Sequence, residues 1–288
     1  GGMSWRTPER ILDRWYREAG IDEIRAHEME SYFARVEKRI NVAYQDDDSI
    51  GLDNKLLQKG ADAKGWKVIP NLRNQLHCTG SNNCAFGCPT GAKQSSLVTY
   101  VPRALHFGAQ IYADARAEKI LFEGKRAVGV QARTVRPDGK RGVKLTVRAK
   151  LVVSSCGAIH TPALLARSGV VSPSGQLGRN LSLHPNTKVV AIFDEPVRGW
   201  EGVHQAFQVR EFHEKGLVFA AVNVPPGMVA MSMGMRGASL GDAMKLYDKM
   251  MVTGMLLEDT SLGAVRTVNG RPQAFYQLKI RVFQLFES

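Results

Sequence analysis

The stretch that decides the fold is LVVSSCGAIHTPALLARSGV at 151–170. Its first three residues form a continuous apolar run, which is typical of a strand buried on both faces. The small residues at 154–158 then favour a tight turn, and a helix is expected near 161–168. A strand, a small-residue turn and a helix in this order can bring backbone N–H groups close to a phosphate or a flavin. Taken alone this is weak evidence, because similar turns occur in α/β proteins that bind nothing there.

The residues before this stretch predict helices in the first third of the chain and strands after residue 109. Short runs rich in Val, Ile, Leu and Tyr, separated by Gly- and Pro-containing turns, lie within 109–150 and predict a small antiparallel meander; they are at 110–113, 117–122, 127–135 and 143–149. In the first third, apolar residues recur at helical spacing over 8–19, 22–40 and, more weakly, 53–64. A further helix is expected between 97 and 108, after a Cys- and Gly-rich loop.

The residues after this stretch add further strand-like runs beyond 187 and a helical segment near 240–252. Asn269-Gly270, between two alternating segments, is the strongest short signal for a β-hairpin. The fold class is therefore α/β, or mixed α+β, in two interleaved domains.

Composition limits the classes of protein and partner. At 288 residues with 44% hydrophobic content, the chain can form one large or two ordinary globular domains. Lys plus Arg less Asp plus Glu is 39 − 27 = +12, which suits an anionic ligand, a nucleic acid or an acidic membrane surface. Residues 115–150 carry much of this excess, and a solvated sheet face explains it equally well.

Location and membrane contact follow from the cysteine count and the apolar windows. Four Cys in a chain of this length favour a reducing compartment, and the opening residues do not look like a signal peptide. Pro225-Pro226 interrupts the longest uncharged window, 216–235, so no transmembrane helix is expected. We expect a cytoplasmic protein, with peripheral association with a membrane surface as an option.

The residues at 154–170 resemble the second signature of the glucose-methanol-choline (GMC) family of flavin oxidoreductases. The matching pairs are Gly157-Ala158, Thr161-Pro162, Leu164-Leu165 and Ser168-Gly169, whereas Val171 departs from the usual glycine. Further blocks follow the family order, at 87–105, 108–121, 124–132, 177–181 and His184-Pro185. The Cys-bearing block looks most like long-chain alcohol oxidases and cholesterol-oxidase-like dehydrogenases.

This resemblance implies an FAD-dependent oxidoreductase that acts on CH–OH groups, passing hydride from a small-molecule alcohol to flavin N5. It implies that the backbone of Ala117 holds the adenine and that Ser155, Gly157 and Ala158 lie beside the cofactor. No catalytic residue and no electron acceptor can be assigned. The uncharged window at 216–235, with its four Met, would suit a long-chain or sterol-like substrate, although a plain core strand pair explains it more simply.

The resemblance also predicts an internal fragment. No Gly-x-Gly-x-x-Gly pattern occurs in 1–288, so the isolated chain is expected to bind FAD weakly or not at all and to oxidise no alcohol. We expect three segments: a helical segment at 1–76 bridging the cofactor and substrate domains, a partial FAD-binding domain with the meander at 77–190, and a partial substrate-binding domain of antiparallel sheet at 191–288.

Cys78, Cys84 and Cys88 form a C-x5-C-x3-C loop whose composition also suits an iron–sulfur cluster or zinc. Only three thiolates are present, so a closed site would need another ligand, such as His77. We favour free thiols or one disulfide over a metal. An iron–sulfur or zinc electron-transfer protein nevertheless stands as the alternative function.

A basic nucleic-acid-binding module is a second alternative. We expect no nucleic-acid partner, because 115–150 contains a single aromatic residue, Phe122, and so no stacking platform. His184 and His204 are candidate acid–base groups, but a structural role is favoured for both. Hydrolase and NTPase signatures are absent from the sequence.

Overall fold

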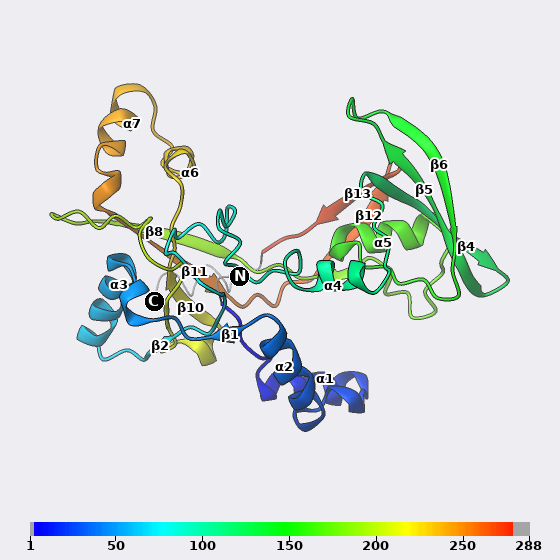
Figure 1. Cartoon of the computed structure of the whole chain (residues 1–288), viewed down its shortest axis with the longest axis horizontal. Coiled ribbons are helices and arrows are strands. Elements are labelled where there is room, and N and C mark those ends of the chain that lie inside the picture. The colour runs from blue at the N-terminus through cyan, green and yellow to red at the C-terminus, as the bar shows by residue number, and fades with distance from the viewer. Residues whose placement is uncertain (1–2, 279–288) are drawn as a thin grey trace. The chain divides into compact units, whose positions relative to one another are not determined.

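A computed structural model describes residues 3–278 and confirms a mixed α/β fold with antiparallel sheets (Figure 1). The chain forms two compact units: unit 1 comprises Gly1–Ala109 and Asn186–Leu257, and unit 2 comprises Gln110–Pro185 and Glu258–Ser288. These boundaries differ from those expected at 76/77 and 190/191, because the Cys-rich loop continues unit 1 and the chain returns to that unit at Asn186. The assignment of segments to cofactor and substrate domains stays a prediction.

The helices of unit 1 follow the predicted apolar spacing in the first third of the chain. The helices of the whole unit are α1 (Glu9–Ala19), α2 (Ala26–Arg39), α3 (Leu52–Ala63), α4 (Tyr100–His106), α6 (Pro226–Ser232) and α7 (Gly237–Met244). Short 3-10 turns lie at Asp22–Ile24, Asp47–Ser49, His213–Lys215 and Tyr247–Lys249. Gly20 ends α1 in the left-handed region at φ 64°, and its N–H donates to the carbonyl oxygen of Tyr16 at 2.8 Å. This is the helix stop that a glycine at that position predicts.

One antiparallel sheet forms the centre of unit 1. Its strands, in spatial order, are β2 (Val68–Pro70), β9 (Phe207–Val209), β10 (Leu217–Ala221), β11 (Met250–Leu257) and β8 (Asn186–Ile192), and β1 (Val42–Ala43) pairs separately with β3 (Arg73–Asn74). The helix expected near 240–252 is therefore partly wrong. It ends at Met244, because Met250, Met251 and Val252 are all buried in a strand that pairs on both edges.

The uncharged window at 216–235 divides into a core strand and a helix. Val229 of α6 packs against Val224, Met250 and Val252 in one buried cluster. Met228 and Met231 of the same helix are exposed, the latter at 83%. No helix within residues 3–278 is long and apolar enough to cross a bilayer.

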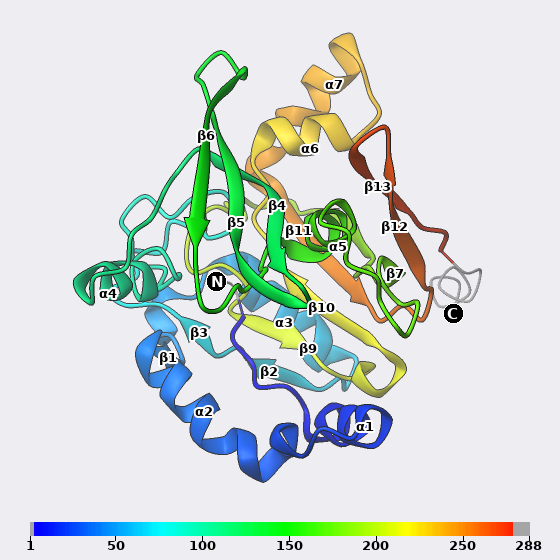
Figure 2. The same ribbon diagram turned by 90° about the vertical axis from the view of Figure 1, so that its right-hand side faces the viewer.

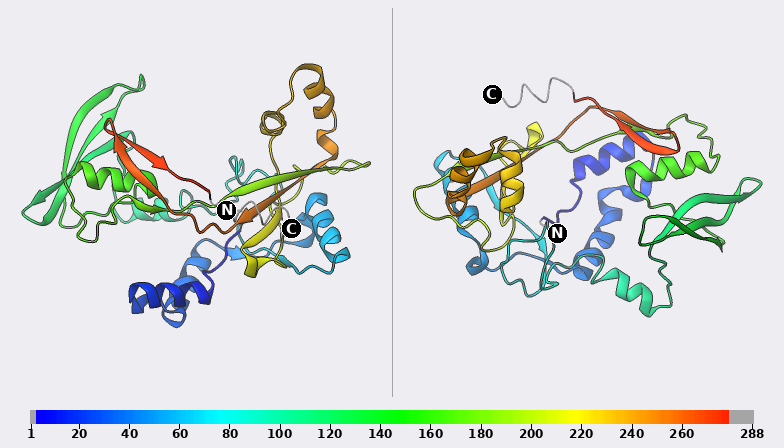
Figure 3. Two further views of the ribbon diagram at one scale, coloured as in Figure 1. Left: turned by 180° about the vertical axis from the view of Figure 1, so that it is seen from behind. Right: turned by 90° about the horizontal axis from the view of Figure 1, so that it is seen from above.

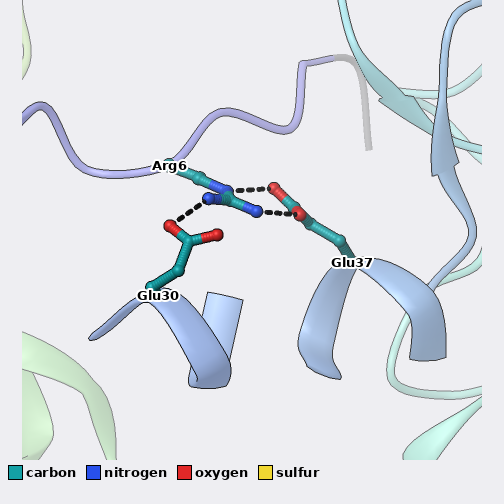
Figure 4. Close-up of polar contacts among 3 residues, drawn as sticks. All are labelled: Arg6, Glu30 and Glu37. Carbon is teal, nitrogen blue, oxygen red and sulfur yellow. Dashed lines mark hydrogen bonds and ion pairs between the residues drawn. The ribbon is translucent and has the colours of Figure 1, made fainter. Parts of the chain in front are cut away.

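An arginine holds the N-terminal segment against α2 in unit 1 (Figure 4). The Nε and Nη2 atoms of Arg6 donate to the two carboxylate oxygens of Glu37, each at 2.7 Å, and its Nη1 donates to Glu30 at 2.6 Å. The hydrogen bonds from Arg6 lower the pKa of Glu37. The group is partly exposed, so it fixes geometry more than it adds stability.

Unit 2 contains the predicted meander (Figure 2). Strands β4 (Ala115–Glu123), β5 (Arg126–Val135) and β6 (Arg141–Arg148) pair antiparallel in that order, whereas the first expected run, at 110–113, is not a strand. Helix α5 (Gly157–Arg167) packs on β4, where Ile120 and Leu164 are buried. The N–H of Ile120 also donates to Ser168 Oγ at 2.8 Å, which ties the end of the helix to the strand.

A second small sheet of unit 2 contains the predicted hairpin. Its order is β13 (Arg271–Phe275), β12 (Gly263–Val268) and β7 (Arg179–Leu181), and β12 and β13 both contact α5 (Figure 3). Asn269 and Gly270 have φ of 49° and 71°. Positive φ at both central residues is the geometry that Asn-Gly predicts.

The strand expected at 151–153 is wrong. These residues are extended but pair with no other segment in the described part of the chain, and α5 begins at Gly157, earlier than predicted. Leu151 and Val153 are 77% and 76% exposed. A strand buried on both faces needs neighbouring strands and covering helices, and none of the described sheets extends to this segment.

Candidate functional site

The N-terminal end of α5 lies in a pocket of about 480 Å³ in unit 2. Gly157, Ala158, Thr161 and Pro162 contribute from the helix, and residues 176–182 contribute from the loop and strand that follow it. Two motifs that are separate in the sequence therefore meet in one place. Ser155 is exposed just before the helix and does not line this pocket.

The first turn of α5 can accept an anionic or electron-rich group. Gly157 has φ of 79°, and a Cβ at this position would meet no heavy atom within 4 Å. The N-cap residue Cys156 makes no side-chain cap, and its own N–H donates to Thr161 Oγ1 at 3.0 Å, so the next N–H groups of the turn and the positive end of the helix dipole lack a capping side chain. These features fit the edge of a flavin cofactor, although each predicted contact of Ser155, Gly157 and Ala158 stays a prediction.

Ala117 lies elsewhere in unit 2, on the edge strand β4. It is half-buried and pairs with Ala132, and the register shifts directly after it. It lines a separate pocket of about 710 Å³ whose walls are strongly basic. The structure therefore does not bring Ala117 into one pocket with Gly157, and the role of Ala117 toward adenine stays a prediction.

The cysteine loop of unit 1 surrounds an arginine. Cys78, Cys84 and Cys88 are free thiols that line one narrow pocket together with Arg73. Arg73 is fully buried, and its Nη2 donates to Cys84 Sγ at 3.2 Å. Burial lowers the pKa of Arg73, and the nearby Cys84 and Cys78 thiols counteract that shift.

The described side chains around these thiols do not gather as metal ligands would. Over residues 3–278, no three His, Cys, Asp or Glu side chains gather where they could hold a metal ion. His77, the suggested fourth ligand, is exposed and does not line the pocket. Neither the iron–sulfur cluster nor the zinc site is supported, because a guanidinium approaches Cys84 where a shared ion would need the three sulfurs to converge.

Hydrogen bonds surround the Cys88 thiol. Burial acts to raise its pKa, but hydrogen bonds, led by one from the Lys93 backbone N–H at 3.4 Å, outweigh burial and lower it. A lowered pKa increases the thiolate fraction, which is the nucleophilic form. This feature cannot be read from the spacing of the cysteines.

Sequence reasoning missed a buried polar cluster in unit 1. Asn54 on α3 accepts hydrogen bonds from the backbone N–H groups of Ala206 at 2.8 Å and Phe207 at 3.2 Å. Its side-chain amide donates to the carboxylate of the neighbouring Asp53 at 2.9 Å. The cluster joins α3 to 203–207, and only the polar residues inside the weak helical pattern at 53–64 could have indicated it.

His204, for which the sequence favours a structural role, belongs to the same cluster. Its Nδ1 lies 2.7 Å from Asn82 Oδ1, and Asn82 Nδ2 donates to the carbonyl oxygen of Gly199 at 2.7 Å. Burial lowers the pKa of His204 to about 4, with a contribution from the positive charge of Arg73. Burial also raises the pKa of Asp53 to about 6, although Asn54 and Asn82 donate hydrogen bonds to it.

Comparison with protein families gives one clear match. Residues 1–186 match the model of the GMC oxidoreductase family. A GMC-type oxidoreductase of Mycobacterium tuberculosis is 36% identical over 278 residues, which is 96% of this chain and 43% of that protein. Another, from Sinorhizobium fredii, is 32% identical over 96% of this chain and 54% of its own length. The chain thus spans about half the length of these relatives.

Two less similar proteins are named for a specific enzyme activity. A long-chain-alcohol oxidase of Arabidopsis thaliana is 28% identical over 92% of this chain and 37% of its own length. Among solved structures, pyridoxine 4-oxidase from Mesorbium loti superposes with a TM-score of 0.67 at 16% identity, covering 96% of this chain and 58% of that one. At this identity the likeness shows a shared fold.

Proposed function

The chain belongs to the GMC oxidoreductase family, and from this we propose that it is part of an FAD-dependent enzyme that oxidises alcohols at CH–OH groups. The observation that carries the proposal is the pocket at the first turn of α5, formed by the residues that resemble the family signature. FAD, when bound, would supply the hydride acceptor.

In this proposal the chain binds and orients the cofactor through its backbone. The N–H groups of the first turn of α5, at Gly157 and Ala158, would lie against FAD, with Ser155 beside them. Glycine is required at 157 because the left-handed backbone disfavours any side chain and the cofactor needs the open space. The backbone of Ala117 would hold the adenine at the free edge of β4. We assign no residue of the chain to proton transfer.

The test compares two glycines at opposite ends of α5, in the product of the complete reading frame that contains residues 1–288. Gly157 and Gly169 have φ of 79° and 78°, and a Cβ on either would meet nothing within 4 Å. Both alanine variants therefore carry a similar backbone strain of about 1 to 2 kcal/mol. We expect Gly157→Ala to weaken FAD binding about tenfold, because its methyl group enters the cofactor's place.

The readout is the flavin absorbance retained after dialysis, with alcohol-dependent bleaching under anaerobic conditions. Gly169→Ala should keep its flavin and its response to alcohol. Equal flavin loss in both variants would assign the effect to strain and contradict a cofactor contact at Gly157. A colourless wild-type product would contradict the proposed function as a whole.

For the substrate we propose a long-chain or sterol-like alcohol. The supports are the name of the Arabidopsis relative and the exposed Met228, Met231 and Met235 on and after α6. Flexible thioether side chains suit an extended apolar chain. We expect kcat/KM to rise with the chain length of primary alcohols, and Met231→Gln to flatten this dependence. Val171→Asn, an equally exposed change in unit 2, should leave the slope unchanged.

We also propose that residues 1–288 alone hold FAD weakly and oxidise no alcohol. The support is that the sequence contains no Gly-x-Gly-x-x-Gly turn for the FAD diphosphate. A purified 288-residue chain that is yellow and reduces a dye with a long-chain alcohol would contradict this.

A further inference from the structure

The basic pocket of unit 2 is formed by the meander, the last turn of α5 and the β12–β13 turn. It has a volume of about 710 Å³, within the range of sites that take small organic ligands. Its walls hold six cations and a single acid, Glu118: the cations are Arg116, Arg133, Lys140, Arg141, Arg167 and Arg271. No aromatic side chain lines it, so a ligand would be recognised by charge and hydrogen bonds rather than by stacking.

The strand register concentrates this charge instead of dispersing it. Arg116 on β4 lies directly opposite Arg133 on β5. Like charges at directly opposed positions destabilise a sheet. Glu118 offsets only part of this, since its carboxylate lies 3.4 Å from Arg133 Nε. The arrangement becomes favourable if an anion enters the pocket.

Two residues that line the pocket each have a buried guanidinium nitrogen that makes no hydrogen bond. The Nε atoms of Arg133 and Arg167 are buried and make no hydrogen bond to any described part of the chain. Arg133 uses Nη1, which donates to the carbonyl oxygen of Gly142 at 3.2 Å, and its ion pair with Glu118 lacks hydrogen-bond geometry at Nε. A buried donor without an acceptor is costly, so these atoms indicate a missing partner that accepts hydrogen bonds.

We propose that this pocket binds a small, multiply charged phosphate-bearing anion through Arg133 and Arg167. Guanidinium groups match the geometry of phosphate oxygens and bind them in pairs of parallel hydrogen bonds. An excess of five positive charges among the lining residues favours a diphosphate over a singly charged ion. The diphosphate group could belong to a free metabolite or to FAD, since Ala117 lies on the same wall. The inference does not depend on the proposed alcohol oxidation.

The test is calorimetric titration of inorganic diphosphate into the 288-residue chain at low and high salt. We expect binding at one site that weakens as salt increases. Arg167→Gln and Arg133→Gln should each weaken binding about tenfold, the size expected for one charge-assisted contact. The matched control is Arg126→Gln, which removes the same charge from an exposed position on β5 outside the pocket.

Three further measurements make the result decisive. Circular dichroism establishes that each variant is folded, and Arg167→Lys keeps the charge but removes Nε, so it should bind more weakly than the wild type. Competition with FAD, carried out in the product of the complete reading frame, identifies the source of the diphosphate: displacement assigns the pocket to the cofactor, and simultaneous binding assigns it to a separate metabolite. Equal losses in all variants including Arg126→Gln, or no binding by the wild type, would overturn the proposal.

Discussion

The buried polar cluster of unit 1 and the basic pocket of unit 2 differ in whether their buried polar atoms have hydrogen-bond partners. In unit 1, Asp53, Asn54, Asn82 and His204 are buried and bind one another or the backbone. In unit 2, Arg133 and Arg167 line a large cavity, and each has a buried Nε that makes no hydrogen bond.

This difference distinguishes polar groups that stabilise the fold from polar groups that are available to bind a ligand. A buried polar group that finds its partners within the chain holds segments together, and its loss should destabilise the protein. A buried donor that finds none, next to open space, indicates a ligand, and its loss should affect binding more than stability. The predictions below test each side of this comparison.

The largest effect is expected at the centre of the unit 1 cluster. Asn54→Ala leaves the N–H groups of Ala206 and Phe207 without their acceptor and removes a donor to Asp53. The free energy of unfolding should fall by about 4 kcal/mol, measured by urea denaturation. Asn186→Ala, at an exposed position of the same unit, should change it by less than about 0.5 kcal/mol. A similar change in the free energy of unfolding for both variants would contradict the structural role of the cluster.

Opposed pH effects are expected from two members of the same cluster. The folded protein keeps the Asp53 proton up to a pKa of about 6 instead of 3.8, so this group's contribution to stability falls as pH rises from about 4 to 6. His204 has its pKa lowered from 6.5 to about 4, so its contribution rises with pH over nearly the same window. Each amounts to about 3 kcal/mol, and the two largely cancel.

Single variants should expose each contribution. With Asp53→Asn, the free energy of unfolding should increase as pH rises through this window, and with His204→Gln it should decrease. Urea denaturation at several pH values measures both slopes, and the double variant serves as the control because it should again be nearly flat. Single-variant curves parallel to the wild type would show that these groups do not titrate differently on folding.

A smaller stability effect is expected in unit 2. Arg167→Gln should change the free energy of unfolding by less than about 1 kcal/mol, because the Nε of Arg167 makes no hydrogen bond that could be lost. At the same concentration, diphosphate should raise the melting temperature of the wild type more than that of this variant. A large destabilisation without ligand would mean that Arg167 is structural and would remove the contrast with unit 1.

The smallest effect is expected at Arg6, which donates hydrogen bonds to Glu37 and Glu30 in a partly exposed group. Arg6→Gln should lower the melting temperature less than any loss in the buried cluster, and the difference should shrink at high salt. Arg10→Gln is the control, since Arg10 makes only a long contact to Glu214, at 4.0 Å. A salt-independent loss at Arg6 would show that exposure does not weaken this group.

Much of the local structure could be predicted because its causes lie close together in the chain. Apolar spacing and Gly20 predicted α1, and Asn269-Gly270 predicted the β12–β13 hairpin. The strand predicted at 151–153 failed for the opposite reason: its burial depends on neighbours that its own residues do not specify.

In the candidate site, too, the sequence predicted the local features and not those that depend on tertiary packing. The signature at 154–170 indicated the family and the turn at Gly157, since a left-handed glycine before a helix is a local property. It did not indicate that 176–182 would complete the pocket, or that Ala117 would line a different one. Those placements depend on how α5 packs against β4 and the second sheet.

The sequence by itself determined the mixed fold class, the family and most helices and turns, because residue type and spacing fix local backbone geometry. Only the tertiary structure decided which charges have partners. Arg73 and Arg167 look alike in the sequence, yet one donates to Cys84 and the other keeps a buried Nε beside a cavity. Partners come from segments distant in the chain, so the three-dimensional packing alone separates a structural arginine from one available to a ligand.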